Sequence, residues 1–201
     1  MKNWDEHYIN GNFTNWDLLY PSQELVAFIA TMTFPKKKVA LDAGCGAGRE
    51  AIFLAQQGWD VIGVDISTEA LRIAAERAKE VGVEVDWRQG DILNLPVENK
   101  FIDFVNDRGC FHSIVEENRD QYVNEIARTL KPGGMILLRG CRDEKEEGHF
   151  VPVTEISVDR YFGKYFDRGS VLPLQMVTGR GYNHEGMKGN LVVLKRNGKY
   201  L

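Results

Sequence analysis

The sequence has few cysteines, no long apolar run and no excess of basic residues. Its three cysteines are an odd number without a C-x-x-C pair, which argues against a disulfide framework and favours a reducing compartment such as the cytoplasm. No cluster of Cys and His has zinc spacing, so we expect no metal site. No apolar run is long enough to cross a bilayer, and the first residues lack the apolar core of a signal peptide.

Acidic residues slightly outnumber basic ones. The 201 residues include 25 Lys and Arg against 29 Asp and Glu, which gives a net charge of -4. This balance argues against a broad phosphate-binding surface, so we expect a small-molecule substrate and neither nucleic acid nor a membrane as partner. The length and a hydrophobic content of 43% predict one domain over 1–201, with residues 1–35 as an aromatic and helical N-terminal cap.

The most informative stretch runs from residue 39 to residue 67. Residues 39–43 and 61–65 are short apolar runs typical of strands covered on both faces, and the segment between them has a helical apolar period. Gly44, Gly46 and Gly48 connect the first strand to this helix. Glycine takes positive φ without strain and lets a ligand approach the backbone at the helix N-terminus. Asp65 ends the second strand, where such units present a carboxylate to ribose hydroxyls, so the pattern predicts a cofactor that contains a nucleoside.

Two kinds of cofactor fit this turn. Gly46, Gly48 and Ala51 match the G-x-G-x-x-A form of a dinucleotide site, so an NAD(P)-binding oxidoreductase stays open. Asp42, however, stands two residues before Gly44 and would repel a phosphate at the mouth of the turn. A carboxylate there suits an ammonium group. S-adenosylmethionine (SAM) has an ammonium, a sulfonium, a ribose and an adenine but no phosphate.

With this acid and glycine turn, the sequence resembles the class I SAM-dependent methyltransferases. The run Leu130-Lys131-Pro132-Gly133-Gly134 is similar to a turn that recurs in that group. The resemblance implies an α/β, Rossmann-like fold with a seven-stranded, mostly parallel sheet, helices on both faces and an antiparallel last strand. The remaining strands are expected at 84–88, 101–107, 135–138, 172–177 and 191–194. Helices are expected to open at 22 and 67 and to cover 123–130 and 158–166.

Two further segments resemble the thiopurine- and tellurite-type small-molecule methyltransferases. They are Trp4-Asp5-Glu6-x-Tyr8, together with Asn15-Trp16-Asp17, and Asp107-Arg108-Gly109-x-x-His112. In that group the first segment caps the site, which makes Trp16 a candidate cofactor contact. A plain hydrophobic clasp packed on the domain is the other open interpretation of these aromatics.

The carboxyl ends of the strands are expected to supply the site residues, because ligands of open parallel sheets lie there. The resemblance implies that Asp91 bonds the adenine amino group with Ile92 against the ring, although a Gly-Asp pair is also a common turn. The expected cofactor-binding residues are Asp42, Gly44, Cys45, Gly46, Gly48, Asp65, Ile66, Asp91, Ile92, Asp107 and Trp16.

Methyl transfer from SAM is an in-line displacement that depends mainly on orientation. We expect His112, Asp107 and Arg108 as catalytic residues. His112 is the first candidate for a general base and Asp107 the second, while Arg108 would orient an anionic acceptor. Thiol, selenium or tellurium acceptors are partly ionised already and need no base. A SAM-binding protein without catalysis is a further open hypothesis, because binding and turnover use many of the same residues.

The segment 179–186 is polar and rich in glycine. It lies between the last two expected strands, so it could form one wall of the acceptor pocket. It could equally be a connection without a function.

Overall fold

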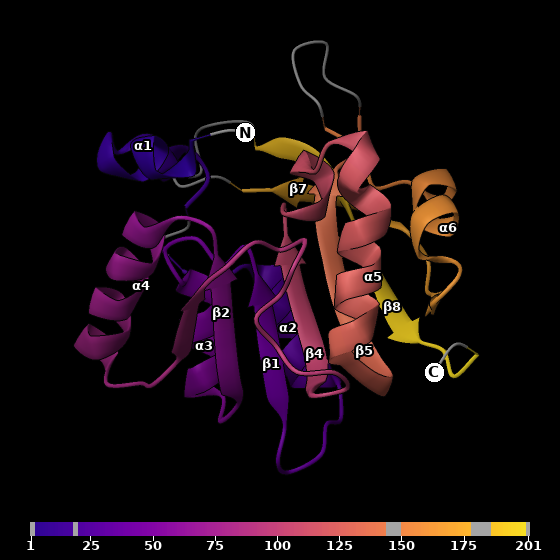
Figure 1. The fold of residues 1–201 in the computed structure, drawn as a ribbon, viewed down its shortest axis with the longest axis horizontal. Coiled ribbons are helices and arrows are strands. Elements are labelled where there is room, and N and C mark those ends of the chain that lie inside the picture. The colour runs from indigo at the N-terminus through magenta and orange to yellow at the C-terminus, as the bar shows by residue number, and fades with distance from the viewer. Residues whose placement is uncertain (1–2, 18–19, 144–149, 178–185, 200–201) are drawn as a thin grey trace.

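A single sheet runs through the molecule, with helices on both faces (Figure 1). The computed structural model describes residues 3–17, 20–143, 150–177 and 186–199. The strands are β1 Val39–Ala43, β2 Asp60–Asp65, β3 Asp86–Gln89, β4 Ile102–Arg108, β5 Leu130–Cys141, β6 Phe166–Arg168, β7 Leu172–Met176 and β8 Met187–Arg196. The helices are α1 Trp4–Ile9, α2 Gln23–Thr31, α3 Arg49–Gln56, α4 Thr68–Val81, α5 Arg119–Thr129 and α6 Glu155–Phe162, with 3-10 turns η1 Asn12–Asn15, η2 Phe111–Ser113 and η3 Glu116–Asn118.

The strand order is β3-β2-β1-β4-β5-β8-β6, with β7 also paired to β8. Strands β1 to β5 are parallel to their neighbours and β8 is antiparallel to β5, which confirms the expected topology. The described residues form eight strands where seven were expected, because two short strands, β6 and β7, share the edge beside β8. Strand β6 pairs with residues 194–196 of β8, and β7 pairs with residues 187–191 of the same strand. The amide of Gly169, between them, still bonds Val193 O at 2.9 Å.

Several expected elements have different bounds in the structure, and two of the differences have a clear reason. The helix expected over 158–166 ends at Phe162, because Gly163 follows it and Phe166 already begins β6, where its ring is buried. The expected turn at 130–134 is instead part of β5. The register moves from the pair Ile102 and Leu130 to the pair Phe104 and Met135, so the extra residues form a bulge in a continuous strand.

Apolar side chains alternate between the two faces of the sheet and form two cores. One core packs α5 and α6 against strands β1, β4 and β5, and the other packs α2 and α3 against the opposite face. Ser67 caps the start of helix α4, because its Oγ accepts the amide of Ala70 at 3.1 Å, which confirms the expected cap. Helix α1 lies beside the start of α4, above the carboxyl ends of the parallel strands (Figure 1). None of the helices in the described parts of the chain is long and apolar enough to cross a membrane.

Candidate cofactor and acceptor site

The glycine turn connects β1 to α3 through three left-handed residues. Gly44, Gly46 and Gly48 have φ of +66°, +52° and +78°. Gly44 and Gly46 are accessible, whereas Gly48 is buried. A Cβ on Gly48 would lie 2.7 Å from the Ala74 side chain and 2.6 Å from that of Trp87. The first two glycines are therefore open at the surface, facing the Cys110 thiol and the Tyr8 hydroxyl, and the third lets α3 and α4 pack closely.

Asp65 lies at the end of β2 with its carboxylate facing the turn. Its Oδ2 accepts the amide of Gly46 at 2.8 Å and its Oδ1 accepts the amide of Ser67 at 2.9 Å. Burial raises the pKa of Asp65, against the opposing effect of these backbone bonds. The next side chain, Ile66, is 38% exposed, which is unusual for an isoleucine and leaves an apolar surface beside the carboxylate. An acid and an apolar side chain in this order fit a ribose and an adenine ring.

Asp91 and Ile92 follow β3 at the same edge. The amide of Gly90 donates to Asp65 O at 3.0 Å, so the ends of β2 and β3 are adjacent. Asp91 Oδ1 accepts the amide of Leu93 at 2.9 Å, which is the turn role left open by the sequence. Asp91 and Ile92 are both half-buried and remain accessible from the edge.

Asp42 lies below the turn and not at its mouth, contrary to the expectation. It is 4% exposed, and its carboxylate accepts the amide of Ala51 at 3.1 Å and the side-chain amide of Asn106 at 2.7 Å. Burial, reinforced by the nearby Glu50, raises the pKa of Asp42 to about 7. Asp42 therefore fixes the start of α3 to the sheet and is not placed to contact a ligand.

A buried ion pair that the sequence analysis missed joins the turn to β5. Arg139 is fully buried, and its guanidinium contacts Glu50 of α3 through two nitrogens at 2.9 and 3.2 Å. Ser22 and Asn106 complete the network, with Ser22 Oγ 2.7 Å from Arg139. Burial would raise the pKa of Glu50, but Arg139 and Arg108 outweigh it and lower the pKa to about 2. The one sequence signal for this pair was an arginine inside the apolar run of β5.

Asp107 near the end of β4 is also inaccessible. It is fully buried and accepts the amides of Cys110 and Phe111 and the hydroxyl of Tyr122, at 2.8, 3.0 and 2.5 Å. Burial raises the pKa of this carboxyl group despite the three bonds. Asp107 is therefore not exposed to a cofactor or acceptor in this structure, because its oxygens hold the turn after β4 together.

His112 is not placed as a general base. It is 7% exposed, and its Nδ1 accepts the amide of Cys141 at 2.8 Å. A ring nitrogen that accepts an N–H carries no proton, so the neutral ring has its proton on Nε2. This ring can donate a hydrogen bond from Nε2, but it can take up a proton only by losing the bond to Cys141.

Arg108, the last residue of β4, is partly accessible, with 13% of its side chain exposed. Its Nη2 donates to Val177 O at 2.7 Å, and its Nε lies 3.7 Å from Glu24 Oε1 on α2. Neither this Nε nor this Oε1 has a hydrogen-bond partner within the described residues. Burial lowers the pKa of Arg108, which remains a cation at neutral pH. This is the charged group of the expected catalytic set that an acceptor could reach.

The expected site residues thus fall into two groups. Those accessible at the carboxyl edge are Gly44, Cys45, Gly46, Asp65, Ile66, Asp91, Ile92, Arg108 and Trp16. Those buried beneath it are Asp42, Gly48, Asp107 and His112. Cys45 is half-buried in the turn, and burial raises the pKa of its thiol well above the ordinary value, which disfavours the thiolate that a nucleophile needs. The expected acceptor wall at 179–186 lies, except for Gly186, outside the described residues.

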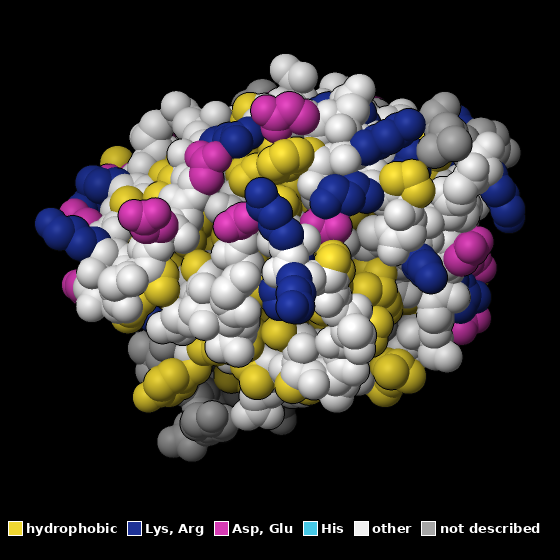
Figure 2. Space-filling view, turned by 90° about the horizontal axis from the view of Figure 1, so that it is seen from below, with side chains coloured by type: hydrophobic (Ala, Val, Ile, Leu, Met, Phe, Trp, Pro, Cys, Tyr) yellow, Lys and Arg dark blue, Asp and Glu magenta, His cyan; other side chains and the backbone are white. Residues whose placement is uncertain are grey.

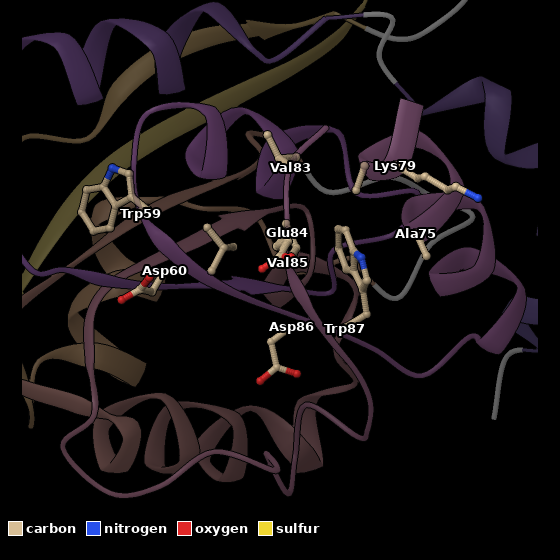
Figure 3. Close-up of a pocket in the computed structure, with 11 residues that line it drawn as sticks. Trp59, Asp60, Ala75, Lys79, Val83, Glu84, Val85, Asp86 and Trp87 are labelled. Atoms are coloured by element: carbon tan, nitrogen blue, oxygen red, sulfur yellow. The ribbon is translucent and has the colours of Figure 1, made fainter. Parts of the chain in front are cut away.

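Two grooves lie away from this edge. One, of about 690 Å³, lies between α4 and the amino ends of β2 and β3, and Figure 3 shows Trp59 and Trp87 among its lining residues. The other, of about 540 Å³, is lined by Lys37, Arg88 and Lys131 among others. Figure 2 views the molecule from below. On this face Lys and Arg side chains lie among acidic ones. Neither groove contains a residue of the accessible group.

Comparison with known proteins identifies the family. A family described as "Methyltransferase domain" matches residues 40–134, which contain the glycine turn, Asp65 and Asp91. An uncharacterised methyltransferase of Schizosaccharomyces pombe is 33% identical over 99 residues, which cover 49% of this chain and 68% of that protein. The 2-heptyl-1-hydroxyquinolin-4(1H)-one methyltransferase of Mycobacteroides abscessus is 27% identical over 180 residues, covering 85% of this chain and 77% of that protein. An Arabidopsis thaliana tRNA (carboxymethyluridine(34)-5-O)-methyltransferase is 30% identical over 142 residues, but these cover 31% of its length and 70% of this chain.

Solved structures agree on the fold. One described as "Conversion of a Disulfide Bond into a Thioacetal Group during Echinomycin Biosynthesis" has a TM-score of 0.85 at 20% identity and covers 98% of this chain and 92% of its own. A phosphoethanolamine N-methyltransferase of Haemonchus contortus, solved with S-adenosylhomocysteine (SAH), has a TM-score of 0.73 at 19% identity, covering 96% of this chain and 57% of its own. The family assignment decides against the dinucleotide alternative. The chain belongs to the class I SAM-dependent methyltransferases, and its cofactor is SAM.

Proposed function

We propose that this methyltransferase acts on a small molecule at the carboxyl edge of its sheet. The observation that supports this most is the placement of charge. Half-buried carboxylates lie along the accessible edge, at Asp65 and Asp91. A nucleic-acid substrate would need unpaired Lys and Arg around the point of methyl transfer, because phosphate contacts dominate its affinity.

The arginines of this edge also favour a small acceptor. Arg77 of α4 forms an ion pair with Asp17 at 2.7 Å, and Arg108 lies beside Glu24. Their charges are thus already balanced by carboxylates of the N-terminal region. One half-buried guanidinium suits a single polar or anionic group of a small acceptor better than a row of phosphates.

We assign the cofactor to the accessible group of residues. Asp65 would hold the ribose, Ile66 and Ile92 would lie against the adenine, and Asp91 would bond its amino group. Gly44, Cys45 and Gly46 would present the backbone of the turn, with Trp16 on the outer side. When bound, SAM supplies an electrophilic methyl group on a sulfonium. The protein has to orient the acceptor in line with that bond and keep water away.

Neither of the two candidate bases, both within the described residues, is placed to help the acceptor. Asp107 has all its bonds inside the protein and His112 has its proton on Nε2, so neither is placed to remove a proton from the acceptor. We therefore propose an acceptor that is soft or already ionised near neutral pH, such as a thiol, a selenium or tellurium compound, or an acidic hydroxyl. The thiopurine- or tellurite-type resemblance fits this chemistry. The relative that is named as a hydroxyquinolinone methyltransferase supports a small acceptor as well.

Two measurements test the proposal. Calorimetry with SAM, SAH and NADH should give heat with the first two only, and a methyl-transfer assay should find turnover within a panel of thiols, selenite, tellurite and acidic phenols. Total tRNA and rRNA in the same assay form the opposing arm. Turnover confined to the RNA arm would overturn the small-molecule acceptor, and binding of SAM without turnover in any arm would favour a non-catalytic role.

A further inference from the structure

Tyr8 of α1 lies over the glycine turn. It is 6% exposed and packs in one cluster with Ala47 and Ala70, which lie within the turn and at the start of α4. A Cβ placed on Gly46 would lie 2.6 Å from the Tyr8 hydroxyl oxygen. The phenol therefore faces the side of the turn where Gly46 has no side chain, and where a ligand can approach its backbone.

The surroundings of Tyr8 leave its hydroxyl as a donor. Phe13 stacks on the Tyr8 ring with centroids 5.1 Å apart, and Trp16 meets it edge-on at 6.1 Å. Among the described residues none accepts a hydrogen bond from the Tyr8 hydroxyl, so its proton remains to be donated to a ligand. Burial and the charge of Asp65 raise the pKa of Tyr8, although the nearby Trp16 lowers it, so the proton is retained at neutral pH.

Asp5, also on α1, ties Tyr8 to the edge of the sheet. Its Oδ1 accepts the hydroxyl of Ser67 at 2.6 Å and the amide of Glu69 at 3.2 Å, at the N-terminus of α4. The amide of Ser67 donates in turn to Asp65 at 2.9 Å. A carboxylate is favourable at a helix N-terminus, where amides are otherwise without partners. Asp5 therefore connects α1, through Ser67, to the residue assigned to the ribose.

A second connection joins Asp17, at the end of the N-terminal segment 3–17, to the glycine turn. Asp17 accepts two bonds from Arg77 of α4, at 2.7 and 3.2 Å. The same guanidinium donates to Ala47 O at 3.0 Å, one residue after Gly46. Arg77 thus holds the N-terminal segment and the glycine turn to one point on α4.

We propose that Tyr8 is a cofactor-binding residue that donates its hydroxyl proton to an oxygen of SAM, and that Asp5 and the Asp17–Arg77 pair are positioning residues that hold it over the turn. The inference rests on the assignment of the glycine turn as the cofactor site. Trp16, expected as a direct contact, then acts through Tyr8. Because the segment covers the turn, these two connections oppose its displacement and so slow the release of the cofactor.

The contact is tested by removing one oxygen. Tyr8→Phe should weaken SAH binding in calorimetry by about tenfold, the scale of one net hydrogen bond. The matched control is Tyr20→Phe, since Tyr20 is 74% exposed and should tolerate the same change. Unchanged affinity in Tyr8→Phe would overturn the contact. The measurement needs no acceptor, so a wrong acceptor class in the proposed function would not affect it.

The positioning role is tested on the two acids. Asp5→Asn and Asp17→Asn should increase the SAH dissociation rate several-fold, and should speed hydrogen exchange of the α1 amides in the cofactor-free protein. Tyr8→Phe should leave that exchange rate as it is. Glu6→Gln is the matched control, because Glu6 lies on the same helix and its carboxylate accepts a bond from Asn3. Faster exchange with an unchanged dissociation rate, or no change in either, would overturn the positioning role.

Discussion

Replacing Arg139 by methionine should destabilise the protein strongly, because it leaves Glu50 charged and buried. Glu50 is 6% exposed, and Arg139 contacts both of its oxygens. Its pKa is about 2 against an ordinary 4.5. At about 1.36 kcal/mol per pH unit, folding stabilises the ionised form of Glu50 by roughly 3 kcal/mol relative to the unfolded chain. Breaking such a pair from one side costs about 3–5 kcal/mol.

A double-mutant cycle gives the decisive measurement. Arg139→Met and Glu50→Gln should each lower the free energy of unfolding in urea by about 3 kcal/mol, since each leaves the other partner buried without its main countercharge. The double variant should lose at least about 2 kcal/mol less than the sum of the two, because no uncompensated charge remains. Additive losses would show that the two residues do not act as a pair and would refute the reasoning.

The control for this cycle is an arginine with similar partners on the surface. Arg72 bonds Glu69 and Glu76 from a side chain that is 52% exposed. Arg72→Met should cost less than about 1 kcal/mol, because water screens these charges. A cost as large as that of Arg139→Met would mean that burial does not set the energy of the pair.

Three further predictions concern the turn and its acids. Asp65→Ala should weaken SAM and SAH binding by about 1–3 kcal/mol in calorimetry, whereas Asp60→Ala, at the opposite end of β2, should not; equal effects would remove Asp65 from the ribose site. Gly48→Ala should lower the free energy of unfolding, because the added Cβ would lie 2.6 Å from Trp87 and 2.7 Å from Ala74. Gly46→Val should abolish SAM binding and leave a folded protein; retained binding would place the ligand elsewhere. The pKa of Asp42 is raised from 3.8 to about 7, so its contribution to stability is full below about pH 4 and is lost as the pH rises through 7. Asp42→Asn should therefore flatten the dependence of the urea midpoint on pH over that range. The same dependence in the variant as in the unchanged protein would contradict the raised pKa.

The sequence by itself determined the fold and predicted the edge of the sheet at which we propose the site. These predictions used local features, namely short apolar runs, the positive-φ glycines of the turn and the cap at Ser67. Such features can be recognised without knowing which distant residues contact them. Asp65 followed by Ile66 was placed correctly for the same reason. The order of the strands then brought their carboxyl ends to one edge.

The tertiary structure alone decided which side chains reach that edge. Adjacent positions of a strand point to opposite faces, so Arg108 is accessible while Asp107 is bonded to Tyr122 in the core. The packing of α4 against the turn assigned Gly48 to helix contact. Tyr8 reached Gly46 because Asp5 and Asp17 bond residues of α4 that lie about sixty positions further along the chain. Contacts across such a distance depend on how the helices pack, which no local pattern in the sequence encodes.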